Sequence, residues 1–245
     1  TDHVDLALAR GEIHALIGPN GAGKTTLINQ LSGEIIPDEG RIVFDGRDLT
    51  HEPPFRRAMV GLGRSFQITS VFNDFTVLQN AALAVQAHAG HSFRFWRAAA
   101  KEAALTEPAL AALKQVGLLE RLHTPVAVLA HGERRQLEIA MVLATGAKLL
   151  LLDEPMAGMS PIESEAVVAL LQKLKGQCTI LLVDAFLPDT RRHVGYWLTQ
   201  LTLLVGAWVT LTTFEAEPAL ALNALVGFRH AGAASAPVPA AGPKK

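Results

Sequence analysis

The sequence predicts an α/β fold with a mostly parallel sheet, and three observations lead to that prediction. Short aliphatic runs at 148–152 and 179–183 have the length and composition of buried parallel strands. A stretch with helical spacing at 161–174 lies between them, which gives the strand, helix, strand order of a parallel unit with a right-handed crossover. A third apolar run at 12–17 ends in a glycine-rich loop, as a buried strand does before a tight connection.

The other expected elements follow in chain order. A helix over 25–31 comes after the glycine-rich loop and closes at a Ser-Gly pair, since glycine commonly follows a helix end. Residues 41–46 end in Asp45-Gly46 and predict an antiparallel hairpin at the edge of the core. From 75 to 144, alanine and leucine recur at helical spacing with few strand signals, which predicts an inserted helical subdomain.

These elements suggest one domain over 1–230, with its core at about 1–74 and 145–230 and the helical subdomain at about 75–144. Residues 231–245 consist mainly of alanine, proline and glycine, so a disordered tail is expected there. The 245-residue chain is 49% hydrophobic and 18% charged, which is ample for a globular core and excludes a linker or tail protein.

Charge and cysteine content exclude several classes of protein and of binding site. With 22 Lys and Arg against 23 Asp and Glu, the chain has no broad electrostatic reason to bind nucleic acid. The single cysteine, Cys178, cannot form an internal disulfide or a multi-cysteine metal site, which favours a reducing compartment. The first residues show no secretory signal pattern. The uncharged segment 194–214 is long enough to span a bilayer, but its five threonines and its aromatic residues suit buried strands at least as well.

A phosphate-binding loop is the most specific pattern in the chain. Residues 18–25 read G-x-x-x-x-G-K-[ST] between an expected strand and an expected helix, as this pattern requires. Glycines let backbone N–H groups turn toward phosphate oxygens, and the helix start presents its positive end to them. The lysine would reach the terminal phosphates, and the threonine hydroxyl would bind Mg²⁺. The residues of this loop are Gly18, Pro19, Asn20, Gly21, Ala22, Gly23, Lys24 and Thr25.

Two adjacent carboxylates complete the predicted chemistry. Asp153 ends an aliphatic strand, which is how a second strand brings a carboxylate to the Mg²⁺ beside a phosphate loop. Glu154 follows it and is placed to orient or deprotonate the attacking water, so hydrolysis is indicated as well as binding. The fold class that follows is α/β: a P-loop NTPase core with a mixed, mostly parallel sheet, an inserted helical subdomain and an edge antiparallel hairpin.

The chain resembles the ATPases of ABC transporters from about residue 11 to 183. Four segments occur in that family's order: Gly18 to Thr26, Gly-Arg-Ser-Phe-Gln ending at Gln67, Leu129-Ala-His-Gly-Glu133, and Leu149-Leu-Leu-Leu-Asp-Glu-Pro155. The stretch 61–96 and Leu137-Glu-Ile-Ala140 are similar to one branch of the family. That branch comprises the ATP-binding subunits of high-affinity importers for branched-chain amino acids and their amide and urea relatives.

The resemblance implies cofactors, roles and partners. ATP and Mg²⁺ are the expected cofactors, with Thr26 part of the ATP-binding loop and Gln67, Thr25 and Asp153 contacting the metal. Gln67 would also contact the water and, with Glu154, make up the catalytic set. The family's signature segment would cap ATP bound to the opposite subunit of a dimer; here it comprises Leu129, Ala130, His131, Gly132 and Glu133. The expected partners are a second ABC ATPase subunit, identical or different, and membrane permease subunits, at the cytoplasmic face of the membrane as a peripheral protein.

The chain departs from the family pattern at two places. The signature segment has Ala130 and Glu133 where a serine and a glutamine are usual; alanine cannot donate to a phosphate, and a glutamate adds repulsion. His131 could donate instead or be an exposed loop residue. After the strand at 179–183, the sequence reads Asp184-Ala185 where the family has an acidic residue and a histidine that contacts the γ-phosphate.

Three hypotheses therefore stand. The first is an ATP-hydrolysing subunit that energises an importer for branched-chain amino acids or related small solutes. The second is a nucleotide-binding but hydrolysis-impaired subunit of an asymmetric pair. The third, an ABC-type protein acting on DNA or ribosomes, is disfavoured by the near-neutral charge, so no nucleic-acid partner is expected.

Overall fold

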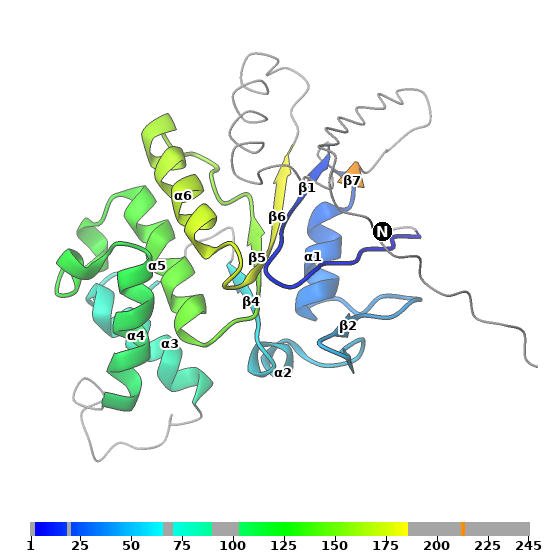
Figure 1. Cartoon of the computed structure of the whole chain (residues 1–245), viewed down its shortest axis with the longest axis horizontal. Helices are drawn as coiled ribbons and strands as arrows, with labels where there is room; N and C mark the ends of the chain where they lie inside the picture. The colour runs from blue at the N-terminus through cyan, green and yellow to red at the C-terminus, as the bar shows by residue number, and fades with distance from the viewer. Residues whose placement is uncertain (1–2, 19–20, 66–70, 90–102, 186–211, 214–245) are drawn as a thin grey trace, which may run out of the picture.

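The computed structural model describes residues 3–18, 21–65, 71–89, 103–185 and 212–213, and a five-stranded sheet forms its centre (Figure 1). The strand order is β4-β5-β6-β1-β7, and each pairing described between these strands is parallel. Their carboxyl ends therefore share one edge of the sheet. The strands are β1 (Ile13–Gly18), β4 (Leu62–Ser65), β5 (Leu149–Asp153), β6 (Thr179–Ala185) and β7 (Thr212–Thr213).

Helices cover both faces of this sheet. Figure 1 shows α1 (Lys24–Ser32) on one side, and α5 (His131–Ala144) and α6 (Pro161–Leu174) on the other. The leucines of β5 alternate between these layers, because successive strand side chains point to opposite faces. Leu149 and Leu151 share an apolar cluster with α1, whereas Leu150 and Leu152 belong to the larger cluster with α5 and α6. A strand buried on both faces explains why 149–152 is an unbroken aliphatic run.

The helical subdomain packs onto the same larger cluster. It contains α3 (Val77–His88), α4 (Ala103–Gln115) and α5, with two short 3₁₀ turns, η2 (Leu119–Arg121) and η3 (Val126–Val128). Helix α3 starts at a reciprocal cap, in which the Thr76 hydroxyl accepts from the Gln79 N–H and the Gln79 amide oxygen accepts from the Thr76 N–H. Alanines such as Ala81 and Ala109 let these helices approach closely.

A small hairpin and one short helix lie beside α1. Strands β2 (Val43–Phe44) and β3 (Arg47–Asp48) pair antiparallel around a two-residue turn, and α2 (Pro54–Met59) follows. Both turn residues have positive φ, 51° at Asp45 and 78° at Gly46, which is the backbone that Asp-Gly favours.

A fully buried arginine joins α1 to this region. Arg57 of α2 is 0% exposed, and its guanidinium donates hydrogen bonds to the carbonyl oxygens of Glu52 at 2.8 Å, Gln30 at 2.6 Å, Leu31 at 2.8 Å and Thr50 at 3.0 Å. Two of these carbonyls belong to the last turn of α1, where carbonyls lack partners within the helix. Arg57 therefore caps the carboxyl end of α1 and fixes it to the segment after the hairpin.

The structure confirms most of the predicted elements. The strands at 12–17, 148–152 and 179–183, the helix at 161–174 and the hairpin are present, with ends shifted by one or two residues. Strand β4 and helix α2 were not predicted, whereas β7 falls within the segment 194–214 that was interpreted as suiting buried strands. The expected tail at 231–245 and nearly all of the uncharged segment 194–214 lie outside the described residues. In the part of the chain that is described, no helix combines the length and the apolar character needed to cross a membrane.

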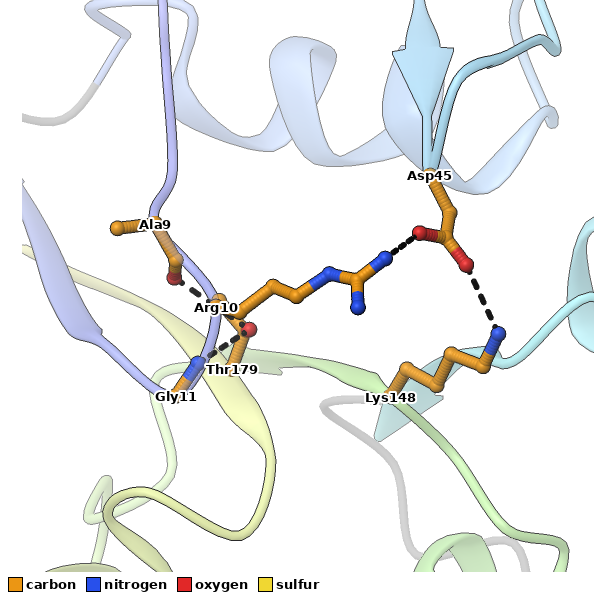
Figure 2. A network of polar contacts seen from close by, with 6 residues as sticks. All are labelled: Ala9, Arg10, Gly11, Asp45, Lys148 and Thr179. Atoms are coloured by element: carbon orange, nitrogen blue, oxygen red, sulfur yellow. Dashed lines mark hydrogen bonds and ion pairs between the residues drawn. The ribbon is translucent and has the colours of Figure 1, made fainter.

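Polar contacts hold the N-terminal segment at the amino end of the sheet (Figure 2). The Thr179 hydroxyl accepts from the Gly11 N–H at 3.0 Å and lies 3.5 Å from the Ala9 carbonyl oxygen. Asp45 in the hairpin turn pairs with Arg10, and with Lys148 at 2.9 Å. The hydrogen bond and attraction from Lys148, with the charge of Arg10, lower the pKa of Asp45. The network thus joins the N-terminal segment, the hairpin and the starts of β5 and β6.

Thr179→Val is expected to lower the free energy of unfolding by about 1–2 kcal/mol, because it leaves the Gly11 N–H without its acceptor in a part-buried place. Valine keeps the shape and the strand preference of threonine, so packing is little changed. Urea unfolding followed by circular dichroism would measure the difference. Arg10→Ala is the contrast within the same network, because the Arg10 side chain is 87% exposed and its ion pair contributes little. Equal losses in the two variants would contradict this assignment.

Candidate nucleotide site

The glycine-rich loop and the Asp153-Glu154 pair meet at the carboxyl edge of the sheet. Strands β1 and β5 both pair with β6, with Gly18 opposite Ala185 and Asp153 opposite Val183. The glycine-rich loop leaves the end of β1, and Asp153 and Glu154 leave the end of β5. The parallel sheet therefore brings two segments 129 residues apart in the chain to the same edge, as the sequence predicted.

The loop between β1 and α1 has the backbone that a phosphate cradle needs. Gly21 and Gly23 have φ of 83° and 88°, a region that side-chain-bearing residues avoid, and Gly23 is the N-cap of α1. Lys24 is buried, and its ammonium donates to the Gly18 carbonyl oxygen at 2.7 Å. Lys24 is thereby held across the mouth of the loop. Pro19 and Asn20 lie outside the described residues.

Helix α1 presents an uncompensated positive end to this loop. Its first turn contains no acidic residue, so the N-terminal partial charge is free of a protein carboxylate in that turn. Thr25 is exposed and Thr26 is half-buried, which leaves the Thr25 side chain accessible for a ligand. A helix start without acidic residues, beside a buried lysine, is a strong anion site.

Asp153 is buried beside two arginines, Arg64 and Arg135. Its side chain is 5% exposed, and one oxygen lies 3.8 Å from a guanidinium nitrogen of Arg64. Burial raises the pKa of Asp153, while the charge of Arg64 opposes that shift. Arg64 also contacts Glu34 at 3.0 Å and the Ser32 hydroxyl at 3.0 Å, so it links the end of α1 to the carboxylate.

Glu154 has an unusual backbone. Its φ is 43°, in the left-handed region that costs roughly 1–2 kcal/mol for a residue with a Cβ. Its N–H donates to the Val183 carbonyl oxygen at 2.8 Å, and its own carbonyl accepts from the Ala157 N–H at 3.1 Å. The neighbouring strand thus holds Glu154 in a turn at the end of β5, where strain of this kind often marks a functional residue.

The signature segment forms the start of α5. Leu129 and Gly132 are buried, whereas Ala130 and His131 are exposed. The Glu133 carboxylate turns back to accept from the Ala130 N–H at 3.0 Å and pairs with Arg121 at 3.0 Å. The repulsion expected from Glu133 is therefore partly offset, because its charge caps its own helix and faces an arginine.

One arginine of α5 connects the helical subdomain to the nucleotide edge. Arg135 is buried, and its guanidinium donates to the Asp153 carbonyl oxygen at 3.0 Å and to Glu138 at 2.7 Å. Sequence reasoning missed Arg135 and Arg64, because their contacts with Asp153 join residues that are distant along the chain. The position of Arg64 within Gly-Arg-Ser-Phe-Gln was the one available signal. Gln67 itself lies outside the described residues.

The residues present fit a nucleotide with Mg²⁺. Among the described residues, no group of three or more His, Cys, Asp and Glu side chains could hold a metal. A protein site with one carboxylate and one hydroxyl, Asp153 and Thr25, suits Mg²⁺, which usually takes its other ligands from phosphates and water. The accessible Thr25 and the buried Lys24 at the glycine loop supply the matching phosphate contacts.

Comparisons with known proteins agree with this arrangement. The ABC transporter family model matches residues 1–157. The chain is 34% identical over 176 residues to a probable branched-chain amino acid transport ATP-binding protein LivG of Archaeoglobus fulgidus, covering 71% of this chain and 68% of that one. It is 35% identical over 190 residues to the high-affinity branched-chain amino acid transport ATP-binding protein BraF of Pseudomonas aeruginosa, covering 74% of each.

A solved structure shares the fold. The ADP conformation of an ATP-binding cassette of an ABC transporter superposes with a TM-score of 0.66 at 29% identity, covering 75% of this chain and 74% of the other. The family match extends over more than half of the chain, and it includes the glycine loop, the signature segment and the Asp153-Glu154 pair. The chain belongs to the ABC transporter family, as an ATPase subunit that resembles those of branched-chain amino acid transporters.

Proposed function

We propose that this chain binds and hydrolyses ATP to energise an ABC importer for branched-chain amino acids or related small solutes. The observation that carries the proposal is the meeting of Lys24, Asp153 and Glu154 at one edge of the parallel sheet, beside an α1 start without acidic residues. The names of the LivG and BraF relatives support the class of cargo.

Each residue has a role that follows from its chemistry. Lys24 and the α1 N–H groups bind and orient the phosphates, Thr25 and Asp153 hold Mg²⁺, and Gln67 contacts the metal and the water. Mg²⁺, when bound, neutralises charge on the phosphates and polarises them toward attack. Glu154 orients the water and accepts its proton. Its rigid turn, held by the Val183 carbonyl, keeps that carboxylate at the end of β5.

A complete site requires a second ATPase chain. The signature segment, Leu129 to Glu133, would face ATP on the partner, whether that partner is identical or different. Membrane permease subunits would transmit the resulting motion, and the chain would then act as a peripheral protein at the cytoplasmic face of the membrane. Nothing in its near-neutral charge supports a nucleic-acid partner.

An open groove between the core and the helical subdomain supports permease docking. The groove has a volume of about 570 Å³ and is lined by residues of α2, β4, α3 and α5. Phe55 and Met59 contribute large exposed apolar side chains, 66% and 56% exposed. Phe72 and Phe75, which precede α3, are also exposed, and their rings lie 5.4 Å apart. A membrane subunit would cover such surface with an apolar segment.

The alternative is a subunit that holds ATP without hydrolysing it. One observation favours it: β6 ends at Ala185, directly opposite Gly18, where the family has a histidine that contacts the γ-phosphate. Ala130 likewise lacks the hydroxyl of the usual signature serine. Loss of one preorganised donor in comparable sites costs on the order of a hundredfold in rate.

Binding of MgATP by the purified full chain, with Lys24→Ala as the variant, tests the proposal. The change is expected to weaken ATP binding about a hundredfold, because it removes a buried charge from the phosphate contacts. Isothermal titration calorimetry would measure both affinities. Lys173→Ala, at an exposed position in α6, removes the same charge and should bind as the wild type does. An affinity that does not depend on Lys24 would overturn the proposal.

A further inference from the structure

One carboxylate joins two segments that belong to different parts of the fold. Glu163 Oε1 accepts from the N–H of Gly132 at 3.1 Å, at the start of α5. Glu163 Oε2 accepts from the Ser160 N–H at 3.0 Å and from the Ser160 hydroxyl at 2.8 Å. Glu163 lies in the first turn of α6, so both of its oxygens are used, one toward the helical subdomain and one toward the core.

The contact to Ser160 alone would be an ordinary helix cap. The Ser160 side chain and Glu163 form the reciprocal cap of α6, in which each satisfies the backbone of the other. Such a cap needs only one carboxylate oxygen. The second oxygen reaches 31 residues back along the chain to Gly132, which a local cap does not require.

Gly132 is shaped to receive this carboxylate. A Cβ built at Gly132 would lie 3.2 Å from Glu163 Cγ and 3.3 Å from Glu163 Cβ, tighter than ordinary contacts. Glycine in a helix is less stable than alanine by about 1 kcal/mol, so this glycine carries a cost within α5. The close approach of Glu163 explains, from contacts within one chain, why glycine rather than alanine occupies position 132.

Electrostatics favour the same arrangement. Hydrogen bonds from the backbone and hydroxyl of Ser160, then from the Gly132 backbone, lower the pKa of Glu163, so the carboxylate is ionised near neutral pH. It lies at the positive ends of both α5 and α6, where a negative charge is stabilised. A charged acceptor forms stronger hydrogen bonds than a neutral one.

We propose that Glu163 is a positioning residue for ATP hydrolysis. It holds the signature segment, at Gly132, in a fixed position relative to the loop 157–160. The consequence for hydrolysis rests on the proposed function, in which the signature segment faces the partner chain. A dimer site closes correctly only when its parts arrive together, and the two hydrogen-bonded sides of Glu163 make the signature segment and this loop move as one unit.

Amide hydrogen exchange of the full chain, without nucleotide, tests the clamp directly. In Glu163→Ala, exchange in 131–134 and in 157–160 is expected to accelerate together, by about tenfold or more, because a charged acceptor is lost from both. Glu165→Ala, at an exposed position of the same helix, is the matched control and should change neither segment. Protection over 166–171 reports whether α6 stays folded. Acceleration in 157–160 with none in 131–134 would overturn the proposal, because Glu163 would then be a local cap only.

Two further variants keep the test decisive. Gly132→Ala adds a methyl group that should push Glu163 away, so exchange in 157–160 should rise although alanine strengthens α5. Glu163→Gln keeps the packing but has one oxygen, so it should restore protection to one segment and not to both. Protection at wild-type levels in both segments in either variant would contradict the clamp.

ATP turnover separates this proposal from the proposed function. Glu163→Ala is expected to lower kcat and leave the KM for ATP unchanged, since Glu163 does not line the glycine loop. Turnover with both constants at wild-type values would refute the positioning role. Absence of MgATP binding in the wild-type chain would instead overturn the proposed function and leave the exchange result standing.

Discussion

Glu154→Gln is expected to bind MgATP with wild-type affinity and to lose at least about a hundredfold in kcat, because general-base catalysis by a positioned side chain contributes about 10²–10⁴-fold. Glutamine keeps the size of the side chain and the backbone hydrogen bonds to Val183 and Ala157. What it loses is the ability to accept a proton from water. Single-turnover and steady-state release of phosphate would measure the change.

A control variant for Glu154→Gln should remove a carboxylate at a position away from the site. Glu165→Gln changes the charge equally at an exposed position of α6 and should keep the wild-type kcat. If wild-type turnover, measured with the second ATPase chain present, is already as slow as that of Glu154→Gln, the chain is the hydrolysis-impaired subunit of the alternative hypothesis. If Glu154→Gln retains wild-type turnover, another group is the base.

Arg57→Met is expected to lower the free energy of unfolding by about 3–5 kcal/mol, because buried carbonyls lose a charged donor that no water can replace. The Arg57 side chain is 0% exposed and donates to the carbonyls of Gln30, Leu31, Thr50 and Glu52. Methionine has a similar unbranched shape, so the loss comes mainly from the hydrogen bonds. Urea unfolding would measure it, and the melting temperature should fall by about 10 °C.

The adjacent arginine is a natural control for this change. Arg56 is 64% exposed and forms one ion pair with Glu52 at 3.4 Å. Arg56→Met should therefore alter stability by less than about 1 kcal/mol, as exposed ion pairs contribute little. Similar losses in the two variants would show that the buried carbonyl contacts of Arg57 are worth no more than a surface pair.

The sequence was sufficient to predict those elements whose structure follows from a local residue pattern. Strands β5 and β6 contain the aliphatic runs 149–152 and 180–183 because both faces of these runs are buried, so composition alone revealed them. The glycine loop was recognisable because its chemistry needs particular residues at fixed spacing. Strand β4 was missed, since Leu-Gly-Arg-Ser has little strand propensity and becomes a strand by pairing with β5.

Contacts between distant segments could not be read in this way. Position 63 in β4 requires glycine, because a Cβ there would lie 2.1 Å from a methyl carbon of Val142 in α5. This reason is visible only in three dimensions. Arg135, Arg64 and Glu163 resemble ordinary charged residues of helices and strands in the sequence. Their partners, Asp153 and Gly132, are brought near by the fold. The predicted loop residues were therefore found from the sequence, and the residues that position them were not.

The left-handed backbone at Glu154 also has a consequence for how this sequence can change. Glycine would adopt φ near 43° without the steric cost that glutamate bears, so a selection for thermal stability alone would favour glycine at this position. Such a variant would fold more stably and keep Lys24 and Asp153 while losing the base. In the proposed function, stability and activity therefore compete at this one residue, and one substitution there would convert a chain that hydrolyses ATP into one that only binds it.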